Sequence, residues 1–279
     1  MERIKFTKMQ GLGNDYIYID GTETVPENLP ELAIKMSDRH FGVGSDGLVV
    51  IAKSEVADFK MIMLNADGSY GEMCGNASRC IAKYVYEKGM TNKTTITLET
   101  LAGIKTLVLD VKDGKVVYVS VDMGLAILTP EKIPVLSKGN FVEFEASGKN
   151  INGTAVSMGN PHVCIFVDDV FFDGFETLGA AIEKHPIFPK KVNVEFIKVI
   201  DKQNVEMRVF ERGSGETLAC GTGACASVVA CVLNGYAEKD TVVKVKLRGG
   251  DLFVEYKSDG RVIMQGGAEF VFEGEYLYA

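Results

Sequence analysis

The sequence is poor in histidine and lacks a long apolar run, a surplus of basic residues and a C-x2-C cysteine pair. With three histidines and cysteine spacings of C-x5-C, C-x4-C and C-x5-C, it offers no C-x2-C knuckle, so a structural zinc site is not expected. No apolar stretch approaches the length of a membrane span, and the start, MERIKFTKMQG, has no secretory apolar core. A net charge of -8 with dispersed Lys and Arg argues against a nucleic-acid partner.

The remaining composition is that of a globular protein with a substantial core. The chain is 46% hydrophobic and 24% charged. Its 279 residues exceed the usual size of one domain, so we expect two. A cytoplasmic, reducing location is the default expectation, and there six cysteines are more often thiols than disulfides.

Short strands dominate the predicted secondary structure. The stretches VVKVKL (242–247) and TITLET (95–100) alternate as half-buried strands do, and Asp113-Gly114 predicts a hairpin turn within 107–121. Helices are expected at roughly 30–40, 77–88, 174–185 and 223–234. The second and fourth are apolar almost all round, which indicates buried central helices.

An internal repeat appears when the sequence is shifted by 146 residues. The matched positions are Gly13-Asn14 with Gly159-Asn160, Cys74-Gly75 with Cys220-Gly221, Gly89 with Gly235, Asn65 with Glu211, and Gly47 with Asn193. We therefore predict an α+β fold of two similar halves, 1–122 and 123–267. Each half would be a strand-rich sheet wrapped around one buried helix.

Two cysteines occupy the same place in this repeat, each just ahead of a predicted helix. The unpaired amides and partial positive charge of a helix start can lower the pKa of a thiol and can bind a carboxylate. Gly75 and Gly221 would let a ligand approach the backbone, and Asn76 and Thr222 are candidate caps. Cys74 and Cys220 are therefore the candidate reactive thiols.

Two such helix starts facing a shared cleft would place one thiol on each face of a carbon atom. That arrangement suits inversion of a stereocentre, since one thiolate removes a proton and the opposite thiol delivers one. A Cys74–Cys220 disulfide is the alternative, and a reducing compartment disfavours it. The other cysteines are better explained as small core residues: Cys80, Cys164, Cys225 and Cys231.

The motifs of the chain resemble those of the diaminopimelate epimerases. They are KMQGLGNDYIYID, RHFGVGSDGLVVI, LNADGSYGEMCGNASRC, SMGNPHVCIFVDD, KVNVEF and VFERGSGETLACGTGACAS, in the family's order between residues 8 and 227. The resemblance implies two pseudo-symmetric α+β domains with the active site in the cleft between them. It also implies that the C-terminal strand, within 268–279, returns to the first half. Homodimers that need neither PLP nor a metal are implied as well.

The resemblance also implies roles for individual residues. Cys74 and Cys220 match the catalytic pair, with His162 and Glu211 as polar partners beside them. The backbones of Gly75-Asn76 and Gly221-Thr222 match the α-carboxylate cradle. The substrate-contacting positions are matched by Asn14, Asn65, Asn160, Asn193, Glu211 and Arg212.

Simpler roles compete for several of these positions. Gly-Asn pairs are common in turns, which applies to Asn14 and Asn160, and Asn65 precedes the turn-like ADGS. Arg212 could form a surface ion pair. Asn193, by contrast, stands in the apolar stretch VNVEF, where a buried amide needs a partner.

The remaining two candidates have simple alternatives as well. Glu211 could be a solvated charge at a strand end. His162 could be a structural histidine.

Three positions depart from the family pattern. Ala77 replaces the usual glycine after Cys-Gly-Asn, and Gly47 stands where some members carry a substrate-contacting glutamine. Phe272 lies near the place of a tyrosine at the dimer contact. A helical backbone at Ala77 would make alanine harmless there, whereas a special backbone angle would not.

The expected reaction is epimerisation of LL-2,6-diaminopimelate to the meso form, in lysine and peptidoglycan precursor biosynthesis. The alternative enzyme is a cofactor-independent racemase of another amino acid, such as proline or histidine. Proline racemases tend to carry histidine after the first Cys-Gly, where this chain has Asn76. A non-catalytic thiol or metal-binding protein is the alternative from another class.

Overall fold

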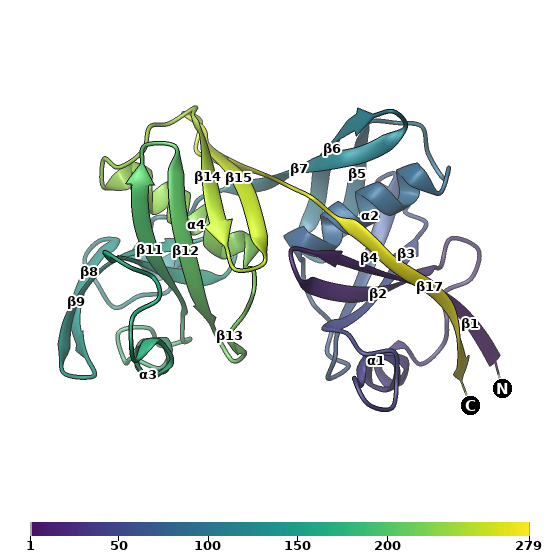
Figure 1. Ribbon diagram of the computed structural model, residues 1–279, viewed down its shortest axis with the longest axis horizontal. Helices are drawn as coiled ribbons and strands as arrows, with labels where there is room; N and C mark the ends of the chain where they lie inside the picture. The colour runs from purple at the N-terminus through teal and green to yellow at the C-terminus, as the bar shows by residue number, and fades with distance from the viewer. Residues whose placement is uncertain (1, 279) are drawn as a thin grey trace. The chain divides into compact units, whose positions relative to one another are not determined.

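The computed structural model describes residues 2–278 and divides the chain into two compact units (Figure 1). The first unit runs to Val121 and resumes at Gln265, and the second is Asp122–Met264. The described helices and strands confirm the predicted α+β class, since strands far outnumber helices in both units.

The first unit is an antiparallel-rich sheet with two helices. Its strands neighbour one another in the order β17–β1–β2–β3–β4–β5–β6–β7, with β2–β3 and β4–β5 parallel and the other pairs antiparallel. Its elements are β1 (Glu2–Gly11), β2 (Asn14–Asp20), α1 (Leu29–Ser37), β3 (Gly47–Ala52), β4 (Phe59–Asn65), α2 (Gly75–Glu87), β5 (Thr95–Thr100), β6 (Gly103–Lys112), β7 (Lys115–Leu125) and β17 (Glu269–Tyr278).

The second unit is built in the same way. Its neighbouring strands are β8–β9–β10–β11–β12–β14–β15, with β10–β11 and β12–β14 parallel, and β13 pairs with β12. Its elements are η1 (Pro130–Lys132), β8 (Phe141–Ala146), β9 (Lys149–Ser157), β10 (Pro161–Phe166), α3 (Phe175–Glu183), β11 (Asn193–Asp201), β12 (Asn204–Glu211), β13 (Gly215–Glu216), α4 (Gly221–Leu233), β14 (Val242–Leu247), β15 (Gly250–Tyr256) and β16 (Arg261–Gly266).

The 146-residue offset found in the sequence carries over to the elements. Adding 146 to the bounds of α1 (29–37) gives those of α3 (175–183), and adding it to α2 (75–87) gives α4 (221–233). Strand register follows too, since Tyr16 pairs with Gly47 in β2–β3 and His162 pairs with Asn193 in β10–β11. The terminal β17 pairs with β1 as β8 pairs with β9.

The two helices of each unit pack on different parts of its sheet. In the second unit, α4 contacts β9, β10, β11, β12, β14 and β15, so the strands wrap around it as predicted. Helix α3 instead packs on β8, β11, β12 and β13. Helix α1 covers β3 and β4, where Leu32, Met36 and Leu48 are fully buried.

Helix α2 is buried as predicted, but the expectation that it is apolar nearly all round is wrong. Arg79 is fully buried and Lys83 nearly so. Lys83 Nζ lies 3.1 Å from a carboxylate oxygen of Glu87 and donates to Val116 O at 2.8 Å. The helix can hold these charges because each has a polar partner within the unit.

The predicted turn at Asp113-Gly114 is confirmed. Lys112 and Lys115 pair across it, and both turn residues have positive φ, 51° for Asp113 and 75° for Gly114. This is the backbone of a two-residue turn whose twist matches that of the flanking strands.

Gly47 has a structural reason that the sequence did not show. A Cβ at this position would lie 2.1 Å from Leu64 O and 2.8 Å from the Tyr16 ring, because β3 is tightly flanked by β4 and β2. No side chain fits there without backbone movement.

We therefore expect Gly47→Ala to lower the free energy of unfolding by roughly 1–3 kcal/mol or more. Urea denaturation followed by circular dichroism measures this. Gly139→Ala is the matched control, since nothing lies within 4 Å of its added Cβ. Equal midpoints for the two variants would contradict the packing argument.

Candidate active site

Cys74 is the N-cap residue of α2. Its backbone is extended, with φ −134° and ψ 119°, and its Sγ accepts a hydrogen bond from Ala77 N at 3.5 Å. Gly75 and Asn76 form the first turn, where the amides have no intrahelical acceptor. The half-buried thiol therefore lies beside amides that could bind an anion.

Three polar side chains are joined to Cys74 within the first unit. The Cys74 thiol donates to Asn14 Oδ1 at 3.4 Å, and Asn76 Nδ2 donates to the same oxygen at 3.2 Å. Arg79 Nη2 donates to Asn76 Oδ1 at 3.0 Å, while its Nε bonds Gly267 O at 3.1 Å. Asn14 is therefore more than a turn residue, and the buried guanidinium fixes the orientation of Asn76.

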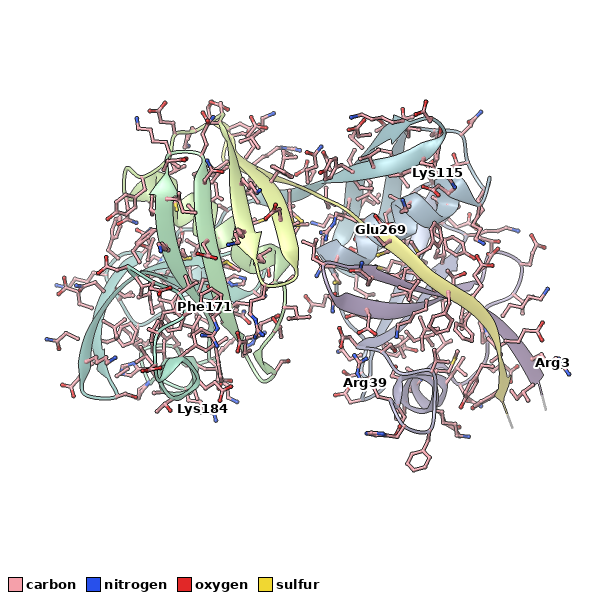
Figure 2. All side chains as sticks on the ribbon, viewed as in Figure 1. Arg3, Arg39, Lys115, Phe171, Lys184 and Glu269 are labelled. Carbon is pink, nitrogen blue, oxygen red and sulfur yellow. The ribbon has the colours of Figure 1, made fainter. Side chains whose placement is uncertain are left out.

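A charged cluster continues from Asn14. Its Nδ2 donates to Asp46 Oδ2 at 2.8 Å, and Arg39, labelled in Figure 2, donates to Asp46 at 3.0 Å and to Asp15 at 2.8 Å. Burial raises the pKa of Asp15, but hydrogen bonds and charges from Arg39 and Lys8 outweigh it, so the pKa lies below its usual value. Burial, followed by the Asp15 charge, raises the pKa of Asp46.

Ala77 is an ordinary helical residue. It is the third residue of α2, it is fully buried, and its φ is not positive. Alanine is thus compatible with the backbone at this position, so this departure from the family pattern does not strain the helix start.

Asn65 is not joined to the Cys74 cluster by a hydrogen bond in the described part of the chain. Its Nδ2 donates to Ser69 Oγ at 2.9 Å, at the turn that follows β4. Asn65 therefore has the turn role that competes with substrate contact at this position.

Cys220 is the N-cap residue of α4, with the same extended backbone as Cys74, φ −120° and ψ 109°. Its Sγ accepts from Gly223 N at 3.4 Å and lies 3.5 Å from Thr222 Oγ1. Gly221 begins the helix behind it.

The expected lowering of the thiol pKa at this helix start is wrong for Cys220. Burial raises the pKa of Cys220 well above its usual value, and the charges of Glu211 and Glu195 add to this effect. The contacts from Thr222 and Gly223 oppose it without prevailing. Desolvation thus outweighs the helix start here.

A chain of polar side chains leads from Cys220 into the core of the second unit. Asn160 Nδ2 donates to Thr222 Oγ1 at 3.3 Å, and Asn160 Oδ1 lies 3.0 Å from His162 Nε2. His162 Nδ1 lies 2.7 Å from Glu195 Oε1, and both side chains are fully buried. Asn160 and His162 therefore make more contacts than a turn residue or a purely structural histidine would need.

Glu211 is half-buried at the end of β12. Burial raises its pKa above the usual value, and hydrogen bonds with Thr217 and Cys220 act against the shift. Thr217 Oγ1 donates to Glu211 Oε1 at 2.5 Å. This carboxylate is therefore held next to the thiol rather than solvated at a strand end.

Asn193 and Arg212 are joined through the backbone. Asn193 is buried, donates through Nδ2 to Pro161 O at 2.8 Å and accepts from Arg212 N at 2.9 Å. The prediction that this buried amide has a partner is confirmed. The exposed Arg212 guanidinium donates to Lys190 O at 3.2 Å.

Four residues beside the thiols were not predicted. Glu195 stands two positions after Asn193, on the same face of an apolar strand, so the argument applied to Asn193 extends to it. Arg79 was visible as a charge inside an apolar helix. Asp46 and Thr217 carried no signal, because polar residues near glycines are ordinary loop residues.

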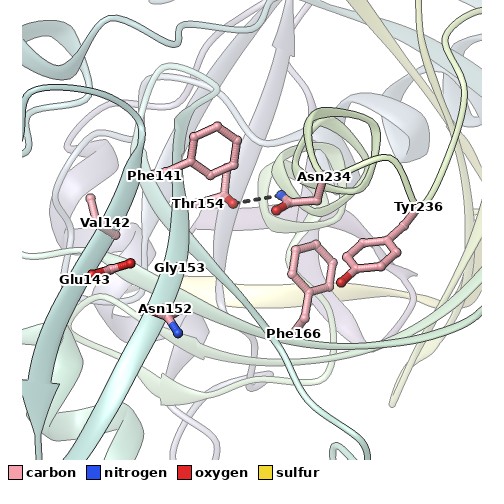
Figure 3. A pocket seen from close by; sticks show the side chains of 9 residues that line it. All are labelled: Phe141, Val142, Glu143, Asn152, Gly153, Thr154, Phe166, Asn234 and Tyr236. Carbon is pink, nitrogen blue, oxygen red and sulfur yellow. Dashed lines mark hydrogen bonds between the residues drawn. The ribbon is translucent and has the colours of Figure 1, made fainter.

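A pocket of about 510 Å³ in the second unit contains none of the predicted site residues. Asn234, the C-cap of α4, donates to Thr154 Oγ1 on its wall at 2.9 Å (Figure 3). The rings of Phe166 and Tyr236 lie 4.7 Å apart at its side. It lies at the end of α4 opposite to Cys220 and is therefore separate from the thiol of this unit.

The described range, residues 2–278, also bears on membrane and metal sites. No helix in this range has the length and apolar character needed to span a membrane. In the same range no group of three or more His, Cys, Asp or Glu side chains is arranged to hold a metal ion.

Solved structures share this fold. A PhzF-family phenazine biosynthesis protein from Bacillus anthracis superposes with a TM-score of 0.73 and 18% identity, each chain being covered completely. A hydroxyproline epimerase from Agrobacterium vitis gives 0.69 and 17% over 99% of this chain and 91% of its own. At such identities the likeness shows the fold alone, which is one that includes amino-acid epimerases.

Sequence comparison gives the family. The family model for diaminopimelate epimerase matches residues 6–129 and 154–271. A diaminopimelate epimerase from Acetivibrio thermocellus is 56% identical over 98% of both chains, and one from Methanococcus maripaludis is 55% identical over 98% of this chain and 99% of its own. The chain belongs to the diaminopimelate epimerase family, and the predicted resemblance is confirmed.

Proposed function

We propose that this protein epimerises LL-2,6-diaminopimelate to meso-diaminopimelate without PLP. The observation that carries the proposal is the pair of N-cap cysteines at one repeat position, Cys74 on α2 and Cys220 on α4, in a member of this family. The runner-up, a racemase of proline or histidine type, is disfavoured by identities of 50–56% to named diaminopimelate epimerases.

In the proposed reaction the two thiols work on opposite faces of the α-carbon. One sulfur removes the α-proton as a thiolate, and the other delivers its thiol proton to the opposite face. Amides of Gly75-Asn76 and Gly221-Thr222 would receive the α-carboxylate and stabilise the negative charge that develops on it. The protons balance, because the thiolate gains the α-proton of the substrate while the opposite thiol gives its own proton to the α-carbon.

The two thiols differ in their surroundings. The half-buried Cys74 thiol donates to Asn14, whereas burial and the charges of Glu211 and Glu195 raise the pKa of the Cys220 thiol. His162 and Glu211 are the polar partners of Cys220, and we infer that they assist its proton transfer.

The distal end of diaminopimelate carries an ammonium and a carboxylate, which need polar partners. We infer that the amides of Asn14, Asn65, Asn160 and Asn193 and the Glu211 carboxylate supply contacts to the substrate. The exposed guanidinium of Arg212 can bind a carboxylate through two parallel hydrogen bonds. Buried polar partners of this kind reject substrates that lack the distal group.

We further propose a cytoplasmic homodimer that takes part in lysine and peptidoglycan precursor biosynthesis, with neither nucleic acid nor membrane as partner. Several cysteines are buried as thiols, which supports a reducing compartment. The half-exposed Phe272 on β17, whose ring lies 5.9 Å from that of Phe6, supports an apolar contact there in place of the family's tyrosine.

The reaction is tested by incubating LL-diaminopimelate with the enzyme in heavy water. We expect meso product carrying one deuterium at the inverted α-carbon, because the donating thiol has exchanged with solvent. Mass spectrometry and proton NMR of early product measure this. L-proline and L-histidine run in parallel, and turnover of either with none of diaminopimelate would favour the alternative racemase. Inversion without deuterium incorporation would exclude the two-thiol mechanism.

A further inference from the structure

Glu195 is a fully buried carboxylate in β11 for which neither the family resemblance nor the repeat implies a role. Its Oε1 lies 2.7 Å from His162 Nδ1, and both side chains have no exposed area. Its Oε2 has no hydrogen-bond partner among the described residues. The contact with His162 is thus the one hydrogen bond described for this carboxylate, and a buried charge needs such a partner.

The repeat shows that this carboxylate belongs to the second unit alone. Subtracting 146 from 195 gives Val49, and subtracting it from 162 gives Tyr16, so the first unit has neither the acid nor the imidazole. The helix start differs accordingly. A Cβ at Gly223 would lie 2.7 Å from Glu195 Oε1, whereas the corresponding residue of the first unit is Ala77.

Both ring nitrogens of His162 lie within hydrogen-bonding distance of an oxygen atom, Glu195 Oε1 on one side and Asn160 Oδ1 on the other. The amide of Asn160 is oriented by donating to Thr222 Oγ1, whose hydroxyl hydrogen can then point to Cys220 Sγ. A ring that donates from both nitrogens is doubly protonated.

We propose that Glu195 is a positioning residue that holds His162 in its doubly protonated form, so that Asn160 and Thr222 direct their donors toward the Cys220 sulfur. The inference rests on the proposed role of Cys220. Burial disfavours ionisation of this thiol, and a chain of donors ending at the sulfur compensates for that when the thiolate forms.

Glu195→Gln and Glu195→Val test the proposal. Gln keeps the shape and can still accept from His162 Nδ1, but it lacks the negative charge that stabilises a doubly protonated ring. Val is the residue at the corresponding position of the first unit, Val49. We expect both to lower kcat by about 100-fold, the lower end of what a positioned acid or base contributes. Glu87→Gln is the control, since that carboxylate is also buried but lies at the far end of α2.

A spectroscopic readout separates positioning from simple support of the fold. In protein labelled with ¹⁵N-histidine, only three histidines contribute, and His162→Asn assigns the signal. We expect both ring nitrogens of His162 to carry protons near neutral pH in the wild type, and one in Glu195→Val, with thermal unfolding of Glu195→Gln close to that of Glu87→Gln.

The outcomes decide between the two proposals. If the wild type turns over diaminopimelate and both Glu195 variants match it, the positioning role is wrong. If the wild type shows no epimerase activity, the proposed function fails, and the role of Glu195 is then tested by the nitrogen spectra alone. A His162 ring that is singly protonated in the wild type, or unchanged in Glu195→Val, overturns the inference.

Discussion

Cys74→Ala and Cys220→Ala are each expected to lower kcat by at least about 10³-fold, because each removes the only group proposed to move a proton on one face of the substrate. The folded structure should persist, since the N-cap role of a thiol is a weak one. The measurement is α-hydrogen exchange and stereochemical change of diaminopimelate, followed by NMR.

The chain supplies a matched control for each variant. Cys80 lies in α2, which Cys74 caps, and Cys231 lies in α4, which Cys220 caps. Burial raises the pKa of Cys80 and of Cys231 to about 12. Cys80→Ala and Cys231→Ala should therefore retain kcat and lose only about 1 kcal/mol of stability. Loss of activity in the control variants equal to that in Cys74→Ala or Cys220→Ala would show that the thiols act through packing.

Gly223→Ala is expected to lower kcat by roughly 100-fold and the free energy of unfolding by about 1–3 kcal/mol. Its Cβ would lie 2.7 Å from Glu195 Oε1 and 3.3 Å from both Cβ and Sγ of Cys220. Glu195 cannot yield freely, because it is held by His162. Steady-state kinetics and thermal denaturation measure the two effects.

The reverse substitution in the first unit is the control. Ala77→Gly makes the repeat position alike in both units, and it removes only a methyl group from an ordinary helical turn. We expect near-wild-type kcat and a loss of about 0.5–1 kcal/mol from the added backbone freedom. An Ala77→Gly enzyme as impaired as Gly223→Ala would refute the difference between the two helix starts.

The repeat made much of the fold predictable. Helices α2 and α4 begin directly after Cys74 and Cys220, whose backbones are extended. The burial of α4 follows from its apolar composition. Strand ends were also predictable where polarity alternates, as in β5 and β14. Local pattern was sufficient because β5 and β14 alternate in polarity and α4 is apolar along nearly its whole length.

What could not be predicted depends on contacts between residues far apart in the chain. The position of Arg79 inside an apolar helix is visible in the sequence, but its hydrogen-bond partners Asn76 and Gly267 are not. The pKa of Cys220 was misjudged, because the helix start is visible in the sequence whereas the desolvation comes from neighbours that are not.

The pairing of β17 with β1 has a consequence for synthesis of the chain. The second unit, Asp122–Met264, is continuous, whereas the first unit includes residues from Gln265 onward. One edge of β1 stays unpaired until β17 emerges from the ribosome, since β2 covers only the other edge. During translation the unit that begins first is therefore completed last, and until then its exposed strand edge is open to pairing with other chains.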